Sequence, residues 1–134
     1  MDIIQVIRQR FVENADVRLA VEGNSIRIIP VREGGFEVGL SAHEGCQFTV
    51  WFAGWHEEFE REDEALECLA FGLSGQCRLK ILSAGGFDYR WTVEYRSNAR
   101  WIEDSTTGLL AWPFWKKRTI RYLRNDLLPR EEIP

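Results

Sequence analysis

The sequence predicts an α+β protein, in which helices and antiparallel strands occupy separate segments of the chain. Apolar residues recur at helical spacing in two short segments, whereas most of the remainder alternates at a period of two. Turn residues separate the alternating segments about every 10 residues, as in antiparallel meanders. The length of 134 residues is typical of one domain, so we expect a single α+β domain over residues 1–134.

Residues 1–53 predict an N-terminal helix followed by strands. After a capping residue at Asp2, helical spacing places four apolar side chains on one stripe, namely Ile3, Ile4, Ile7 and Phe11. We expect this helix to end near Glu13. From Asp16 the period changes to two, and the segments VRLAVE, SIRIIPV, FEVGLS and CQFTVWFA predict a four-strand antiparallel meander.

Helical spacing returns after an acidic run. Residues 57–67 hold seven Asp or Glu and one Arg. Because acidic residues in a first turn are stabilised by the helix dipole, we interpret this run as the solvated start of a second helix over residues 63–74, which ends before Gly75. The segments CRLKILSA and DYRWTVEYR then predict a hairpin around Gly85-Gly86, and RWIED continues the antiparallel strands.

The C-terminal element has an ambiguous pattern. Ile120, Leu123 and Leu127 fit one face of a short helix, but RTIRYL also fits a short edge strand, and we favour the helix. The predicted order of elements resembles in outline that of small acidic α+β proteins such as the type III secretion chaperones. This resemblance of topology implies a secretion-chaperone-like role as one alternative function.

Charge and cysteine content restrict the classes of function. The net charge of −4 argues against a nucleic-acid partner, although residues 1–77 carry 6 Lys and Arg against 14 Asp and Glu, while residues 78–134 carry 11 against 7. Three cysteines, an odd number, indicate a reducing compartment. No apolar run is long enough to span a membrane. We therefore expect a cytoplasmic protein, and a bacterial one.

No sequence pattern identifies catalytic residues, a cofactor or a metal site. His43, Cys46 and His56 could supply metal ligands, but a strand that extends from Cys46 to His56 spans roughly 30 Å, too far for one ion. The chain has no phosphate-binding glycine motif and no Cys-x-x-Cys pair. These observations favour a protein that is not an enzyme.

The segment LLAWPFWKKR holds the strongest functional candidate. Leaving Trp112, Phe114 and Trp115 all in water would forgo roughly 5–9 kcal/mol of burial, so we expect one face of an extended segment to join the core. Pro113 cannot donate a ladder hydrogen bond, which predicts a sheet edge or a bulge here. The second apolar face would be covered by the C-terminal element, which makes the whole segment core, or by a partner.

We therefore expect a non-catalytic, cytosolic binding or regulatory protein that contacts another protein or a second copy of itself, as a dimer. Its predicted partner-binding residues are Trp112, Phe114, Trp115, Lys116, Lys117, Arg118 and Arg121. The alternative is an enzyme or small-molecule-binding domain with an aromatic-lined pocket between sheet and helices. That pocket would be lined by Trp51, Trp55, Trp91 and Trp101.

Overall fold

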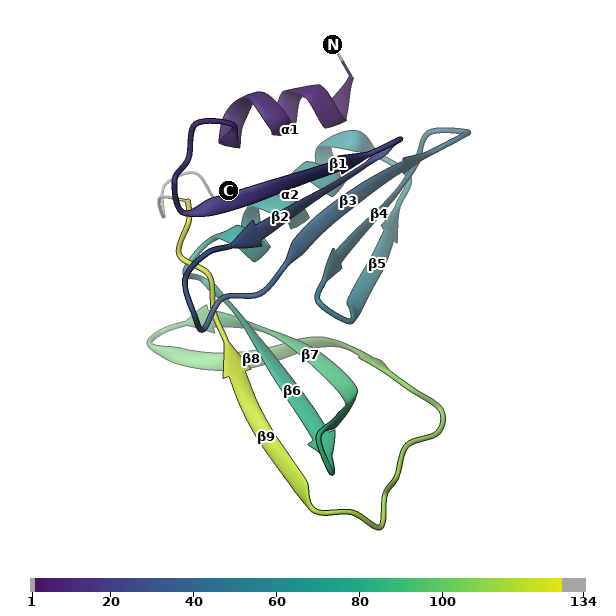
Figure 1. The fold of residues 1–134 in the computed structure, drawn as a ribbon, viewed down its shortest axis with the longest axis vertical. Coiled ribbons are helices and arrows are strands. Elements are labelled where there is room, and N and C mark those ends of the chain that lie inside the picture. The colour runs from purple at the N-terminus through teal and green to yellow at the C-terminus, as the bar shows by residue number, and fades with distance from the viewer. Residues whose placement is uncertain (1, 129–134) are drawn as a thin grey trace.

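The computed structural model describes residues 2–128 and has an α+β fold built from two antiparallel sheets (Figure 1). The helices and strands, in chain order, are α1 Ile3–Phe11, β1 Val17–Glu22, β2 Ser25–Pro30, β3 Val38–His43, β4 Gln47–Phe52, β5 Trp55–Phe59, α2 Glu62–Leu73, β6 Cys77–Ala84, β7 Phe87–Ser97, β8 Arg100–Gly108 and β9 Arg118–Leu123. The first sheet has the order β1-β2-β3-β4-β5, and the second has the order β8-β7-β6-β9.

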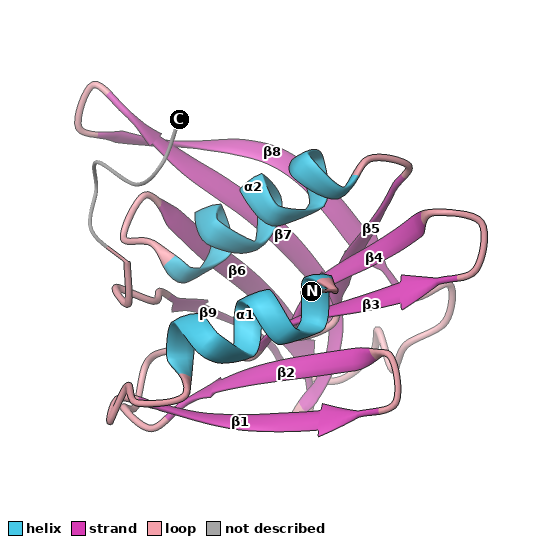
Figure 2. Cartoon of the chain, turned by 90° about the horizontal axis from the view of Figure 1, so that it is seen from above, coloured by secondary structure: helices cyan, strands magenta, loops and turns pink. Residues whose placement is uncertain are grey.

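Helix α1 confirms the N-terminal prediction. The Asp2 side chain caps the helix by accepting a hydrogen bond from the Gln5 backbone N–H at 2.9 Å, which satisfies one of the free donors of the first turn. The predicted apolar stripe is buried, and it consists of Ile3, Ile4, Ile7 and Phe11. Both helices lie over the strands when the molecule is viewed from above (Figure 2).

The meander has five strands, so the prediction of four was wrong by one. The chain reverses at Ala53, whose φ of 53° is left-handed, and Trp55 then pairs with Phe52. The exposed carboxylates of Glu57 and Glu58 on β5 belong to the acidic run, which the sequence assigned to the approach of a helix. A strand at the edge of a sheet accepts such charges because its outward positions face water.

Helix α2 begins at Glu62, within one residue of its predicted start. Its first turn carries three acidic residues, as expected from the helix dipole, and it ends at Leu73. A buried side of the helix packs on the meander, where Gly72 lies against the ring of Phe52 so closely that a Cβ at position 72 would be 2.3 Å from a ring carbon. The absence of a side chain at Gly72 therefore sets the distance between helix and sheet.

The second sheet contains the predicted hairpin of β6 and β7, which turns at Gly85 and Gly86, both with positive φ. The C-terminal segment is an edge strand, so the edge-strand alternative is confirmed and the favoured helix was wrong. Strand β9 pairs antiparallel with the free edge of β6, with Leu79 opposite Leu123 and Ile81 opposite Arg121. A free ladder edge on β6 supplies backbone partners to RTIRYL, and this outweighs the helical spacing of its apolar residues.

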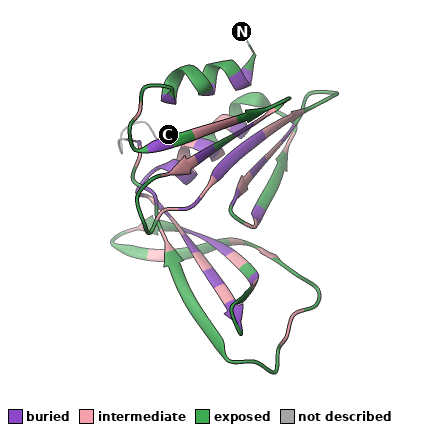
Figure 3. Ribbon diagram, viewed as in Figure 1, coloured by how far each residue is buried: buried purple, intermediate pink, exposed green. Residues whose placement is uncertain are grey.

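The buried residues of both sheets and both helices form one continuous hydrophobic cluster (Figure 3). Asn125, which is only 1% exposed, holds three parts of the chain together within it. Its Oδ1 accepts from the Phe36 backbone N–H, and its Nδ2 donates to the Phe36 and Gly72 carbonyls, all at 3.0 Å. The segment after β9 is thereby tied to the loop before β3 and to the end of α2.

Candidate functional site

The segment between β8 and β9, residues 109–117, is a loop, and the expected edge strand over LLAWPFW is wrong. Within the loop, the Phe114 N–H donates to the Trp112 carbonyl at 2.8 Å and the Lys116 N–H to the Pro113 carbonyl at 3.0 Å. The two ends of the loop bond outside it, since the Leu109 N–H donates to the Tyr89 carbonyl and the Lys117 carbonyl accepts from the Gly85 N–H, both at 2.8 Å. Pro113 has no N–H to offer a neighbouring strand. The chain therefore turns back on itself here, and the loop extends away from the sheets at one end of the molecule (Figure 1).

Most of the large side chains of this loop are exposed, contrary to the expectation that one face joins the core. The exposed fractions are 102% for Leu110, 64% for Phe114 and 72% for Trp115. Phe114 and Trp115 contact each other edge to face, with ring centroids 5.3 Å apart. Single exposed apolar residues are common on proteins, whereas contiguous exposed apolar groups are typical of interaction sites.

Trp112 anchors the loop to the second sheet. Its indole lies flat on the buried ring of Tyr89, with centroids 4.8 Å apart and an interplanar angle of 6°. The indole N–H of Trp112 is buried and has no acceptor within the described residues. Of the three predicted aromatic contact residues, Trp112 therefore holds the loop in place, and Phe114 and Trp115 face the solvent.

The loop meets the β6–β7 turn and forms an apolar groove of about 630 Å³ with it. The groove is lined by Phe87, which is 47% exposed, and by residues 110–115. The backbone N–H of Gly85 donates to the Lys117 carbonyl at 2.8 Å, which joins the turn to the end of the loop. We call this surface, made of Phe87 and residues 109–115, the aromatic tip.

The basic residues predicted to bind a partner differ in their environments. Lys116, Lys117 and Arg118 are exposed beside the aromatic tip. Arg121 instead forms a two-pronged ion pair with Asp88 at 2.7 and 2.8 Å and also donates to Ser83 at 3.0 Å. The structure therefore assigns Arg121 to the joint between β9 and the β6–β7 hairpin, and it leaves three cations at the tip.

Replacing Asp88 with Asn is expected to lower the free energy of unfolding at pH 7 by about 0.5–1 kcal/mol, since this ion pair is partly exposed. Hydrogen bonding by Arg121 holds the pKa of Asp88 below its usual value. The stability that this ion pair provides is therefore fully present above the Asp88 pKa of the unfolded chain, near 4, and is lost as the pH falls through the lower pKa of the folded protein. Urea unfolding at pH 7 and pH 2.5 measures this change, with Glu33→Gln on an exposed loop as the control. A difference between wild type and Asp88→Asn that persists unchanged at pH 2.5 would contradict the assignment.

The four tryptophans of the alternative pocket do not converge on one site. Trp51 donates to Glu37 at 2.9 Å on the face of the first sheet that is turned away from the helices, where it also lies over Gly39. Trp55 stacks on the buried Phe52, and its indole donates to Ser105 of the second sheet at 2.9 Å. These contacts give Trp51 and Trp55 structural roles in opposite faces of the first sheet.

The other two tryptophans lie on the second sheet. The indole of Trp91, on β7, packs on Gly54 in the turn between β4 and β5, where an added Cβ would come within 2.2 Å of it. Trp91 therefore fills the contact between the two sheets. Trp101 lies on the outer face of the second sheet beneath three guanidinium groups, those of Arg78, Arg96 and Arg124, at 4.7–5.5 Å from its ring centroid. The expected pocket between sheet and helices therefore does not form from these four side chains.

A cavity of about 460 Å³ lies instead on the outer face of the second sheet, where the sequence predicted only a wet face. It is lined by Lys80, Leu82, Arg90, Thr92, Glu103, Thr106, Gly108, Leu109 and Leu110. Ladder partners in antiparallel strands share a face, so the pairs Lys80 with Thr92 and Leu82 with Arg90 place these side chains together. The alternation of polar residues in DYRWTVEYR was the sequence signal for this face.

Beside this cavity lies a closed cluster around Arg78. Its guanidinium stands 4.1 Å from the ring centroid of Tyr122 and 4.7 Å from that of Trp101, and its Nε donates to the buried Glu94 carboxylate at 2.7 Å. The charge of Glu94 is thus compensated by a partner that is itself held between two rings. This cluster lies on the same face of β6 and β7 as Lys80 and Thr92 of the cavity.

The remaining reactive groups do not form a site within residues 2–128. No group of three or more His, Cys, Asp or Glu side chains in this range is placed to hold a metal ion. His43 donates to or accepts from the Thr49 hydroxyl at 2.9 Å. Burial raises the pKa of the Cys68 thiol to about 12 and raises that of Cys77 as well, which keeps both protonated at neutral pH. No helix of the described chain is long and apolar enough to cross a bilayer.

Comparison with known proteins identifies no relative of this chain. No family model matches the chain, and no curated protein and no solved structure matches it either.

Proposed function

We propose that this protein is a non-catalytic binding protein, which engages another protein through the aromatic tip. The observation that supports this proposal is the exposure of Leu110, Phe114 and Trp115 on one protruding loop. Burying such a side chain is worth roughly 1.5–3 kcal/mol, so covering all three offers about 5–9 kcal/mol to a complex. Aromatic residues beside cations are also the typical composition of energetic centres in protein interfaces.

The charge at the tip indicates what kind of protein surface fits it. Residues 105–125 contain five Lys or Arg and no Asp or Glu. Two of these cations, Arg121 and Arg124, bind within the protein, to Asp88 and to the Gly75 carbonyl respectively. The remaining three, Lys116, Lys117 and Arg118, favour a partner whose apolar patch is bordered by carboxylates.

The same charges disfavour the expected dimer in which two tips meet. A symmetric contact places the same surface of both copies together, so three cations of one copy would face three of the other. Such like-charge contacts oppose association unless counterions or partner carboxylates intervene. We therefore propose a different, acidic protein as the partner, and self-association through the tip becomes an outcome of the test.

Photo-cross-linking tests this proposal in the cells that make the protein. With p-benzoylphenylalanine in place of Trp115, we expect one discrete protein adduct whose sequence, read by mass spectrometry, contains acidic and apolar residues at the linked site. The control places the same probe at Val31, which is 61% exposed on the loop after β2 and lies outside the tip. Adducts only to a second copy, only to lipid, or equal at both positions would overturn the proposal.

Trp115→Ser provides the matching affinity measurement. Because Trp115 is mostly exposed, its replacement is expected to change the free energy of unfolding by no more than about 0.5 kcal/mol. Binding of the identified partner is expected to weaken by at least about 30-fold, the equivalent of 2 kcal/mol for a buried aromatic anchor. Calorimetric titration measures the affinity, and chemical unfolding checks the stability. An unchanged affinity in a stable variant would exclude Trp115 as an anchor.

A further inference from the structure

The cavity on the outer face of the second sheet has the chemistry of a site for a small ligand. Its volume of about 460 Å³ lies within the range of pockets that hold small molecules. Strands β6, β7 and β8 form its floor, and the start of the loop, Leu109 and Leu110, forms one wall. Leu109 and Leu110 also belong to the aromatic tip, but the strand residues Lys80, Arg90, Thr92 and Thr106 lie outside it, so the site lies beyond the proposed function.

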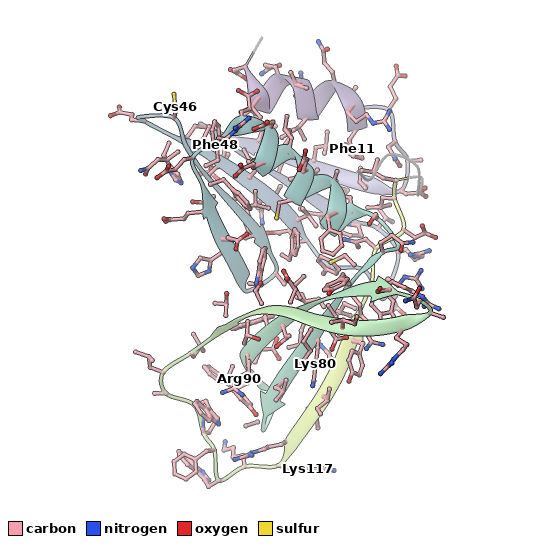
Figure 4. All side chains as sticks on the ribbon, turned by 180° about the vertical axis from the view of Figure 1, so that it is seen from behind. Phe11, Cys46, Phe48, Lys80, Arg90 and Lys117 are labelled. Carbon is pink, nitrogen blue, oxygen red and sulfur yellow. The ribbon has the colours of Figure 1, made fainter. Side chains whose placement is uncertain are left out.

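Two cations reach into this space. Lys80 and Arg90 both extend from the sheet toward the side that the loop encloses (Figure 4). The Lys80 side chain is 24% exposed, and its ammonium group meets the Glu103 carboxylate only at 3.5 Å, while Glu103 is itself 60% exposed. Arg90 has no carboxylate within ion-pair distance in the described part of the chain, and its guanidinium lies 6.0 Å from the Tyr89 ring centroid. Arg90 is therefore available to an anion.

The floor between the cations adds a hydroxyl donor. The side-chain oxygens of Thr92 and Thr106 lie 2.9 Å apart, so one hydroxyl donates to the other. The accepting hydroxyl keeps its own proton, which remains free to donate to a ligand. Thr92 is only 4% exposed whereas Thr106 is exposed, so the Thr106 hydroxyl, with Thr92 donating to it, is the one that a ligand can reach. A fixed hydroxyl between a lysine and an arginine matches the oxygens of a carboxylate or a phosphate.

Apart from the Glu103 carboxylate, which pairs with Lys80 at 3.5 Å, the rest of the lining is apolar. Leu82 lies on the floor opposite Ile120 of β9, and Leu109 and Leu110 stand across from it. An inorganic anion would leave these side chains without a contact, whereas an apolar body attached to the anionic group would cover them. The lining therefore fits an amphipathic molecule with one charged end.

Contacts beside the cavity argue against a single-stranded nucleic acid on this face. Base stacking requires an accessible aromatic ring, but Arg78 lies over both Trp101 and Tyr122, and Arg96 and Arg124 also cover Trp101. A short ligand that needs only the cavity is favoured over a polyanion that must follow the whole sheet.

We infer that the cavity between Lys80, Arg90 and Leu109–Leu110 binds a small amphipathic organic anion, with its carboxylate or phosphate monoester at Lys80, Arg90 and the Thr92–Thr106 hydroxyl pair, and its apolar body against Leu82, Leu109 and Leu110. The ligand is held without covalent change. Both head groups share the same recognition chemistry, namely two cations and one hydroxyl donor, and the experiment distinguishes them.

Calorimetric titration of the intact protein with three probes of equal chain length tests this inference. Decanoate and decyl phosphate carry the two head groups, and decanol is the uncharged control. We expect at least one of the anions to bind about tenfold or more tightly than decanol, and the tighter anion identifies the head group. Equal affinity of decanol and both anions would overturn the inference, because the cations would then have no role.

Variants locate the site. Arg90→Met and Lys80→Met are each expected to weaken binding of the tighter anion about tenfold, the loss of one charge-assisted contact, and Arg90→Lys is expected to restore part of it. Arg32→Met removes the same charge from the exposed loop after β2, outside the cavity and the aromatic tip, and should leave the affinity within about twofold. Circular dichroism confirms that each variant is folded. Equal losses in Arg32→Met and Arg90→Met, or no loss in a folded Arg90→Met, would place the anion elsewhere and overturn the inference.

Discussion

Asn125→Ala is expected to lower the free energy of unfolding by about 3–5 kcal/mol, a large part of the stability of a typical domain. The Asn125 amide is 1% exposed and forms three hydrogen bonds of 3.0 Å, to the N–H and carbonyl of Phe36 and to the carbonyl of Gly72. Alanine would leave these backbone groups buried without partners, and each such group costs roughly 1–3 kcal/mol.

Chemical unfolding of wild type and Asn125→Ala measures this effect. Asn14→Ala is a matched control, since the Asn14 side chain accepts one hydrogen bond, from the Asp16 N–H at 2.8 Å, in an exposed turn. The control should lose no more than about 1 kcal/mol. A comparable loss in both variants would mean that water satisfies the groups around Asn125, and the segment after β9 would then contribute little to the core.

Gly72→Ala is expected to lower the free energy of unfolding by about 2 kcal/mol, opposite in sign to the usual effect. In a helix interior, replacing glycine with alanine normally stabilises by about 1 kcal/mol. Here the added Cβ would lie 2.3 Å from a ring carbon of Phe52, whose side chain is fully buried. The helix must move or the ring must leave its rotamer, and overpacking of this kind costs roughly 1–3 kcal/mol.

A double-mutant cycle separates this clash from other causes. Phe52→Leu removes the ring atoms that Gly72 faces, so Gly72→Ala should cost much less in that background, with a coupling of about 1 kcal/mol or more. Ala70→Gly, in the same helix, reports the ordinary propensity and should destabilise by about 1 kcal/mol. Additive effects of Gly72→Ala and Phe52→Leu would show that the helix moves freely over the sheet.

The sequence predicted the elements whose local pattern agrees with their environment. Helix α1, helix α2 and the β6–β7 hairpin follow from periodicity, because one face of each is buried and the other is wet. Strand β5 was missed because Glu57 and Glu58 interrupt its alternation and because the turn before it uses Ala53 in a left-handed conformation instead of Asn-Gly. Strand β9 was misassigned because its identity depends on the free edge of β6, which is distant in the sequence.

The candidate site was predictable in part. The aromatic composition of residues 109–115 identified the segment, but burial of an aromatic residue depends on whether a neighbouring surface is present to cover it. Only Trp112 finds such a surface, on Tyr89, and Phe114 and Trp115 do not. The cavity could not be predicted, because Lys80, Arg90 and Thr106 meet only through the register of three strands.

The separation of charge along the chain has a consequence for the rate at which a partner arrives. The exposed carboxylates of β5 and α2 lie in the acidic N-terminal part, and the cations of the tip lie in the basic C-terminal part. Such a molecule has an electric dipole that turns the tip toward an acidic surface during diffusion, before any aromatic contact forms. For the proposed acidic partner, added salt is therefore expected to slow association while leaving dissociation, which would be set by the proposed aromatic contacts, nearly constant.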